Sequence, residues 1–328
     1  MPSLPLQYRT PLLVAWLIAA PLLTTGQSLK SFYNGTVQLF YEEKGTGPAL
    51  YILSGGPGEP PDDPYRQIID SLQAYYTCVL LHQRGAGLSR GLPINEKTIT
   101  IHNYTEDIEQ LRQVRGDRKI ALLGVSWGGM LAMNYAAHYG RYVDHLLLIA
   151  SAPPSYRVWN VLYENQFARR SRAELDSMAM WQKIFAHKTE RELDSLKRHD
   201  PDCPEVLAYR AFIGFHVRAM YYDRSKISKQ KLDRLFYDFN FQPIPIIDRE
   251  VPETRWDITE KLRTLKAPAL IVYGRQDDQG ESTFYLQKES LRYSEGHVIE
   301  QCGHEIVEEQ PVEFFRILLD YVKRRRKM

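Results

Sequence analysis

Cysteine is scarce in this sequence: only Cys78, Cys203 and Cys302 occur among the 328 residues. Three cysteines cannot all pair within one chain, and their spacings match no metal-binding framework. Cys78 lies in an apolar run, where a cysteine usually serves as a small buried hydrophobe. The scarcity therefore argues against a disulfide scaffold and against a structural metal site.

An excess of charge of either sign is also missing. The chain has 42 Lys and Arg against 40 Asp and Glu, a formal net charge of +2. This balance gives no reason to expect a nucleic-acid partner. The one basic cluster, Lys323–Lys327, follows an amphipathic stretch at the C-terminus and is typical of a solvated helix end, which the helix dipole favours.

The apolar run near the N-terminus, Pro11–Leu23, is too short to span a bilayer comfortably, and no stop-transfer pattern follows it. Arg9 is the only charge in residues 1–28, and the stretch Thr24–Ser28 is small and polar. This pattern predicts a secretory signal peptide over residues 1–27, with cleavage near Gly26. We expect a secreted or periplasmic protein without a stable membrane anchor.

Strand and helix patterns alternate along the remaining chain, which has no internal repeat and no low-complexity segment. Strands separated by helices pair in parallel with right-handed crossovers, so the pattern predicts an α/β fold with a mostly parallel central sheet flanked by helices. Strands are predicted at 36–41, 49–53, 76–81, 119–125, 145–150, 267–273 and 297–300, and helices at 64–75, 104–115, 131–137 and 311–322.

The alternation stops between residues 155 and 256, where we find no convincing strand. Helices are predicted instead at 158–167, 172–185, 190–197, 206–220 and 229–239. We interpret 155–256 as an inserted helical cap on a core made of 28–154 and 257–328. Its mixture of Tyr, Trp, Phe, Arg and Glu suits a substrate pocket or an ordinary amphipathic cover, and a cap over the strand ends would be both.

The most informative stretch is Gly124-Val-Ser-Trp-Gly128, which lies between a predicted strand and a predicted helix. Such a turn forces Ser126 into a strained conformation that exposes its hydroxyl, and the glycines avoid collisions with the neighbouring strand and helix. The pattern also arises by chance in glycine-containing loops, but the flanking strand and helix favour a nucleophile. The N–H of Trp127 begins the helix without a helical partner and would face a developing oxyanion.

A second glycine-rich stretch, Ser54-Gly-Gly-Pro-Gly58, follows the strand at 49–53. Glycines directly after a strand indicate unusual backbone angles or a close approach. By itself this would be a tight surface turn, but with Ser126 downstream we expect it to supply the second oxyanion N–H. We place that N–H at Gly56, with Gly55 as the alternative.

Asp277 and His304 each follow a late predicted strand, as Ser126 follows an earlier one. A serine nucleophile needs a base to take its proton, and an imidazole base needs a carboxylate to fix its tautomer. All three would lie at the carboxyl edge of one sheet, and their order along the chain is that of the α/β-hydrolases. Asp278 is the rival acid. We prefer Asp277 because it directly follows the turn that begins at Gly274.

Together these motifs make the sequence resemble the α/β-hydrolase serine peptidases that include the prolyl aminopeptidases, also called proline iminopeptidases. The resemblance covers roughly residues 36–154 and 257–325. It rests on five stretches: Gly55-Gly-Pro-Gly58, His82-Gln-Arg-Gly-Ala-Gly-Leu-Ser89, Gly124-Val-Ser-Trp-Gly128, Gly274-Arg-Gln-Asp277 and Gly303-His304.

The resemblance implies an α/β-hydrolase fold with a helical cap and an acyl-enzyme mechanism that needs neither metal nor organic cofactor. The substrate would be a short peptide that loses an N-terminal proline or small apolar residue. The alternatives are an esterase or lactonase on the same core, with a small acyl substrate, and a catalytically inactive binding protein. Nothing in the sequence indicates an oligomeric state.

This sequence departs from the family's pattern at several positions. Ser54 replaces the usual histidine before the glycines, and His82 replaces the aspartate that opens the second loop. The family holds the substrate's amino terminus with cap glutamates, but its Trp-Glu cap motif is not found here. Glu164, Glu174 and Glu205 are alternative partners for the amine.

Overall fold

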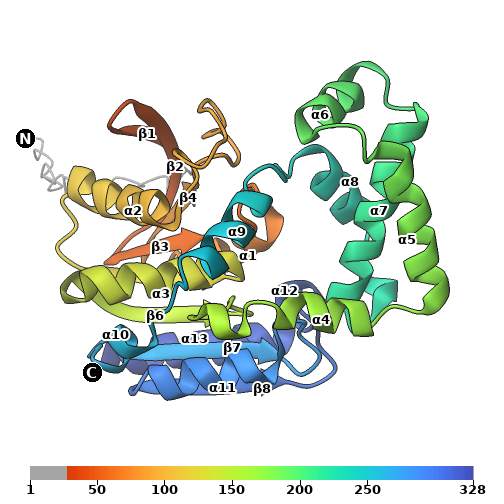
Figure 1. Cartoon of the computed structure of the whole chain (residues 1–328). Helices are drawn as coiled ribbons and strands as arrows, with labels where there is room; N and C mark the ends of the chain where they lie inside the picture. The colour runs from red at the N-terminus through yellow and green to blue at the C-terminus, as the bar shows by residue number, and fades with distance from the viewer. Residues whose placement is uncertain (1–27, 328) are drawn as a thin grey trace, which may run out of the picture.

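The computed structural model describes residues 28–327, so the predicted signal peptide lies outside the described residues. Its centre is an eight-stranded sheet in the order β1-β2-β4-β3-β5-β6-β7-β8 (Figure 1). The pairs from β4 to β8 are parallel, and β1–β2 and β2–β4 are antiparallel. This confirms the predicted mostly parallel sheet. The strands are β1 Ser28–Asn34, β2 Val37–Gly45, β3 Ala49–Leu53, β4 Thr77–His82, β5 Ile120–Val125, β6 Val143–Ile149, β7 Ala269–Gly274 and β8 Ser294–Ile299.

Helices cover both faces of the sheet, which explains why its central strands are continuous apolar runs. Every residue of β3 and of β7 is buried. One face packs against α1 Asp63–Leu72, α12 Ile306–Glu309 and α13 Pro311–Lys327. The other packs against α2 Ile101–Arg115, α3 Trp127–Tyr139, α10 Thr259–Arg263 and α11 Gly280–Ser290.

The chain leaves the sheet after β6 and returns before β7, and an isolated bridge pairs Ser155 with Asp257 where the two passes meet. In Figure 1 the helices α5 to α8 stand to one side of the sheet. They form a hydrophobic cluster of their own around Phe185, Tyr209 and Phe236. The helices are α4 Val161–Ala168, α5 Arg172–Phe185, α6 Glu190–His199, α7 Pro204–Met220 and α8 Lys229–Tyr237.

One further helix of this excursion, α9 Ile244–Glu253, behaves differently. Its Ile247 and Val251 belong to the same hydrophobic cluster as α2 and α3, so α9 packs on the core. The sequence did not predict it, because prolines at positions 245 and 252 interrupt the helical pattern. Among residues 28–327, no helix combines the length and apolar character needed to cross a bilayer.

Candidate active site

Ser126 occupies the turn between β5 and α3 in a backbone conformation that residues other than glycine rarely adopt, with φ 53° and ψ −120°. Its N–H donates to the Ile149 carbonyl at 2.9 Å, which anchors the turn to β6. A Cβ on Gly124 would lie 2.2 Å from the Gly128 oxygen, and one on Gly128 would lie 2.2 Å from the Leu53 oxygen. The two glycines are therefore required by the close passage of β5, α3 and β3, and the strained serine is typical of a nucleophile.

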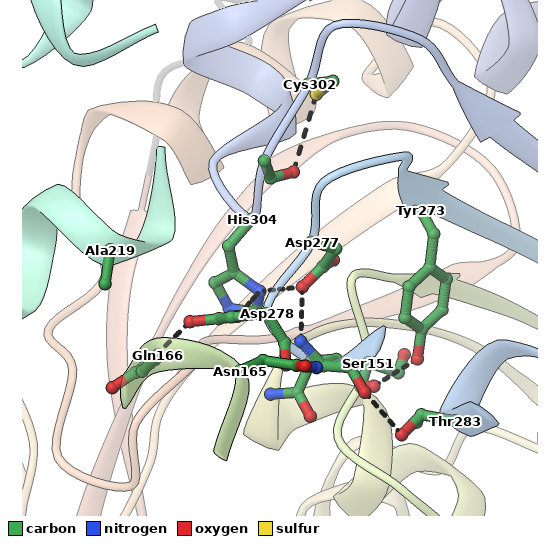
Figure 2. Close-up of polar contacts among 12 residues, drawn as sticks. Ser151, Asn165, Gln166, Ala219, Tyr273, Asp277, Asp278, Thr283, Cys302 and His304 are labelled. Carbon is green, nitrogen blue, oxygen red and sulfur yellow. Dashed lines mark hydrogen bonds and ion pairs between the residues drawn. The ribbon is translucent and has the colours of Figure 1, made fainter. Parts of the chain in front are cut away.

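His304 lies in the loop after β8 and faces the turn after β7. Its Nδ1–H donates to Asp277 Oδ1 at 2.8 Å, and the Gln279 backbone N–H donates to the same oxygen at 2.9 Å (Figure 2). Both side chains are buried. Ser126 and His304 line one cavity. The structure thus brings the predicted base and acid into direct contact, and places the predicted nucleophile at the same cavity.

The His304 loop is fixed in place by the end of cap helix α7. The His304 N–H donates to the Met220 carbonyl at 2.7 Å. The Glu309 carboxylate accepts backbone N–H groups from Gly303, Tyr222 and Asp223 at 2.7 to 3.0 Å. Because the imidazole's own backbone is tied to cap and core together, its orientation depends on both regions.

A second carboxyl group, that of Asp278, reaches the same imidazole. Its Oδ1 lies 3.3 Å from His304 Nδ1. Burial opposes a charge on His304, but Asp277 and Asp278 outweigh it and raise the pKa of the imidazole to about 10. Burial raises the pKa of the Asp278 carboxyl well above its ordinary value, against the attraction of His304. In the neutral imidazole, a proton fixed on Nδ1 leaves Nε2 to accept one from a serine.

The glycine-rich loop after β3 contributes backbone groups beside Ser126. The Gly55 N–H donates to the Tyr65 hydroxyl at 2.8 Å, and that hydroxyl donates to Glu59 Oε2 at 2.6 Å. Since the Gly55 N–H already has a partner, the geometry favours Gly56 over Gly55 as an oxyanion donor. Gly56 adopts φ +108°, which favours glycine, and a Cβ there would lie 2.6 Å from the Gly58 nitrogen.

Sequence reasoning assigned no role to Gln83, which connects these two loops. Its Nε2 donates to the Ser54 carbonyl at 2.7 Å, and its Oε1 accepts the Trp127 indole N–H at 3.0 Å. The neighbouring Arg84 pairs with the buried carboxylate of Asp107. The Gln-Arg-Gly motif therefore supports the oxyanion loop and the serine turn from behind. Gln83 lies in one of the five stretches that resemble the prolyl aminopeptidases, and this position could have indicated its supporting role from the sequence.

The cavity at Ser126 has a volume of about 420 Å³. Cap residues supply most of its apolar walls, including Trp159, Leu162, Phe212, Ile213, Phe239 and Phe241. Its acidic lining residues are Glu59, Glu190, Asp248, Asp278 and Glu305. None of the three glutamates predicted to bind an amine is among them. Glu174, for example, caps its own helix at Ser171 and pairs with Arg224.

Asp277, Asp278 and His304 could in principle hold a metal ion, because one ligand atom from each lies within 4.8 Å of the others. All three residues are buried. A cation bound by this set would compete with the hydrogen bond between His304 Nδ1 and Asp277. The donor set therefore suits a proton relay better than a resident metal.

Residues 48–311 match the protein family described as the alpha/beta hydrolase fold. The chain belongs to this family. The match spans strands β3 to β8, the helical excursion and all five motifs, and it confirms the predicted fold class.

Proteins with different names are similar to this chain. Proline iminopeptidases are 24% identical over 287 residues in Lactobacillus helveticus (85% of this chain, 91% of the relative) and 28% identical over 292 residues in Saccharolobus solfataricus (86% and 87%). A 2-hydroxy-6-oxo-6-phenylhexa-2,4-dienoate hydrolase of Comamonas testosteroni is 22% identical over 299 residues (88% and 92%). The crystal structure of a Mycobacterium smegmatis proline iminopeptidase has a TM-score of 0.64 at 19% identity (90% and 98%). The resemblance to the proline iminopeptidases is confirmed, while the substrate of this α/β hydrolase has to be argued from its site.

Proposed function

We propose that this α/β hydrolase is a serine aminopeptidase of the prolyl aminopeptidase type, which removes an N-terminal proline or small apolar residue from short peptides. The names of its relatives and the five core motifs support the proposal. The observation that carries it is a carboxyl group, that of Glu59, beside Ser126.

In this mechanism the Ser126 hydroxyl attacks the carbonyl carbon of the first residue. His304 Nε2 takes the serine proton, and Asp277 stabilises the imidazolium that forms. The N–H groups of Trp127 and Gly56 hold the oxyanion. His304 then protonates the leaving amine, and water hydrolyses the acyl-enzyme by the same route. Each step uses side chains and backbone groups of this chain alone.

The position of Glu59 suits the ammonium of such a substrate. The site of a Cβ on Gly55 is 2.4 Å from Glu59 Oε2 and 3.5 Å from Ser126 Cβ, so the carboxyl group and the nucleophile are neighbours. In an N-terminal residue, one carbon separates the ammonium nitrogen from the carbonyl carbon. A substrate attacked by Ser126 would therefore bring its ammonium close to Glu59.

The charge around Glu59 supports the same assignment. Burial raises the pKa of its carboxyl, and Lys231 opposes this while Glu305 adds to it. A bound ammonium would favour the ionised form. Glu305 is less available, because the buried Lys231 ammonium already lies 3.0 Å from its Oε2. Glu190 and Asp248 each accept a tyrosine hydroxyl, as Glu59 does from Tyr65, so the closeness to Ser126 is what favours Glu59.

The test compares proline 4-nitroanilide with its N-acetyl form. We expect acetylation to abolish cleavage, and Glu59→Gln to lower kcat/KM on the free amine by roughly 30-fold, from about 2 kcal/mol of lost ion pairing. Glu174→Gln is the matched control, because this glutamate lies away from the cavity and should leave kcat/KM unaltered. Equal rates on free and acetylated substrates would contradict the proposal.

The second candidate is an esterase or lactonase, which the apolar walls of the cavity favour because they suit an acyl chain. Activity on 4-nitrophenyl butyrate without activity on the anilide would select it. Failure of Ser126 to react with a fluorophosphonate would instead point to an inactive binding protein.

We also propose that the enzyme is secreted or periplasmic, on the composition of residues 1–27. Mass spectrometry of the native protein from its host should find a mature chain that begins near Gln27. A chain that retains Met1 or Pro2 would contradict this.

A further inference from the structure

Two neighbouring carboxyl groups share one imidazole in this site, and the proposed mechanism uses only one of them. Asp277 is 3% exposed and Asp278 is fully buried. Their Oδ1 atoms lie 2.8 and 3.3 Å from His304 Nδ1 (Figure 2). Within residues 28–327, both Asp277 Oδ2 and Asp278 Oδ1 are buried without a hydrogen-bond donor. Two such oxygens in one buried cluster are costly if both groups are ionised.

The two carboxyl groups are close enough to hydrogen-bond to each other, so a single proton between them would give both groups an O–H···O partner. It would also leave His304 able to act as a base. Two full negative charges beside the imidazole stabilise its charged form, with a pKa of about 10. Such an imidazolium has no free Nε2 to accept a serine proton near neutral pH. The base therefore needs one carboxylate and one neutral carboxylic acid.

The hydrogen bonds decide which residue carries the proton. Asp277 Oδ1 accepts two N–H groups, from His304 and from Gln279, and both stabilise its ionised form. Asp278 Oδ2 accepts one neutral amide, the Gln166 side chain, at 2.7 Å. Burial is the largest influence on Asp278, and the contact with Asp277 further favours its protonated form.

The other charged groups around this pair do not reverse the assignment. From the cap, Arg169 donates to the Asp277 backbone carbonyl at 3.0 Å and not to a carboxylate. Arg170 interacts electrostatically with Asp278, but its own hydrogen bond goes to His216. From the core, the acidic Glu305 acts on His304, and the Tyr273 hydroxyl is bound to the Ser151 carbonyl. Glu59 also interacts electrostatically with His304, and the buried Cys302 lies close enough to interact with Asp277.

We propose that Asp278 is a positioning residue that remains protonated and donates to Asp277, so that Asp277 alone carries the charge that faces His304. Gln166 of cap helix α4 orients this carboxyl group, while burial and the contact with Asp277 favour the protonated form over the effect of the amide. Its amide donates to Oδ2 and leaves Oδ1 to hold the proton. The same helix fixes the turn through Asn165, whose side chain donates to the Asp278 carbonyl at 2.9 Å. The inference relies on the proposed roles of Ser126 and His304 but not on the choice of substrate.

The first test measures the rate constant for labelling of Ser126 by a fluorophosphonate in the full-length protein. Asp278→Ala removes the donor to Asp277, and we expect labelling to slow by roughly 10- to 50-fold. Asp278→Asn should restore the rate to within about threefold of the natural protein, because an amide N–H replaces the acid O–H. An asparagine variant as slow as the alanine variant would overturn the proposal, since the ionised carboxylate would then be required.

The second test detects the proton itself by infrared difference spectroscopy at neutral pH. We expect a carbonyl stretch of a protonated carboxylic acid that is missing in Asp278→Asn and shifted in Gln166→Leu. Asn165→Ala is the matched control, because it removes a contact of the same helix with the backbone of Asp278, and it should keep the band. Absence of an Asp278 acid band in the natural protein would overturn the proposal. A protein that shows the band but does not react with the fluorophosphonate would refute the proposed function instead.

Discussion

The sheet core and the helical cap contribute to the same cavity in different ways. The core supplies Ser126, Asp277 and His304, each held in a loop whose glycines leave no room for a side chain. The cap supplies most of the cavity's apolar wall from amphipathic helices that pack around their own small cluster. The difference indicates that the core holds the proposed reacting groups together with Glu59, and that the cap forms most of the apolar wall against which a substrate would lie.

The two regions also interact where the chemistry is placed. Cap residues bind the backbone of three core loops: Arg169 and Asn165 at the acid turn, Met220 at the His304 loop and Asn240 at the oxyanion loop. The cap is therefore part of the scaffold that holds the reacting groups. The following experiments separate the two contributions.

The largest effect should come from the core alone. Ser126→Ala and His304→Ala should each lower turnover by on the order of 10⁴- to 10⁶-fold, because the two residues act as a unit. The double variant should be little worse than either single variant. Circular dichroism and thermal unfolding should show an intact fold. A well-folded Ser126→Ala protein with substantial activity would refute the assignment of the nucleophile.

Asp277→Asn should lower turnover by roughly 10³- to 10⁴-fold, because an amide in place of the carboxylate neither fixes the imidazole tautomer nor stabilises its charge. Measurement of kcat on the best substrate of the anilide and ester panel checks this. Asp278→Asn provides the comparison within the same turn and should be mild. If the two effects were reversed, Asp278 would be the acid.

A smaller effect should come from the ion pairs between cap and core. Lys231 of α8 is 1% exposed, and its Nζ lies 3.0 Å from Glu305 and 3.2 Å from Glu308 of the core. Lys231→Met removes the cation that lies between these carboxylates and should lower the free energy of unfolding by about 3 kcal/mol. Chemical denaturation checks this against Lys229→Met, an exposed lysine of the same helix. Equal stability of the two variants would show that the buried pair does not join the regions.

The smallest effect should come from a single amide between cap and core. The Asn240 side chain donates to the Gly85 carbonyl at 2.8 Å, and its backbone N–H donates to the Gly58 carbonyl. Asn240→Ala leaves the buried Gly85 oxygen without that donor, so we expect a loss of about 1 to 2 kcal/mol in unfolding free energy. Hydrogen exchange near Gly58 should be faster in this variant than in the natural protein, while exchange in the central strands should change less. If exchange near Gly58 and in the central strands were both unchanged, the Asn240 contact would not hold the loop.

The core was largely predictable because its signals are local. Ser126 and Asp277 each follow an apolar strand, and His304 follows the partly buried strand β8; parallel strands bring such positions to one edge of the sheet. The exception is β1, whose Lys30 and Ser31 are exposed at the edge of the sheet, so that its sequence lacks the apolar run of a central strand.

The cap was predictable as a set of helices but not as a binding surface. Which side chain faces the cavity depends on how each helix docks, and the pattern along one helix does not record this. The interpretation of Glu174 could have been improved from the sequence, since Ser171 and Glu174 form a capping box that engages the glutamate locally. Glu59 stands directly after the glycine run, and its proposed role depends on its closeness to Ser126, which only the fold reveals.

The hydrogen bonds that join core loops to Asn165, Arg169, Met220 and Asn240 have a consequence for recombination between relatives. A cap transplanted as one block at Ser155 and Asp257 would carry its own residues to these four positions. If they did not match the recipient's loops, the chimera would fold with its serine misaligned. To exchange substrate preference within this architecture, the residues that line the cavity and the four residues that contact the core loops would therefore have to be inherited together.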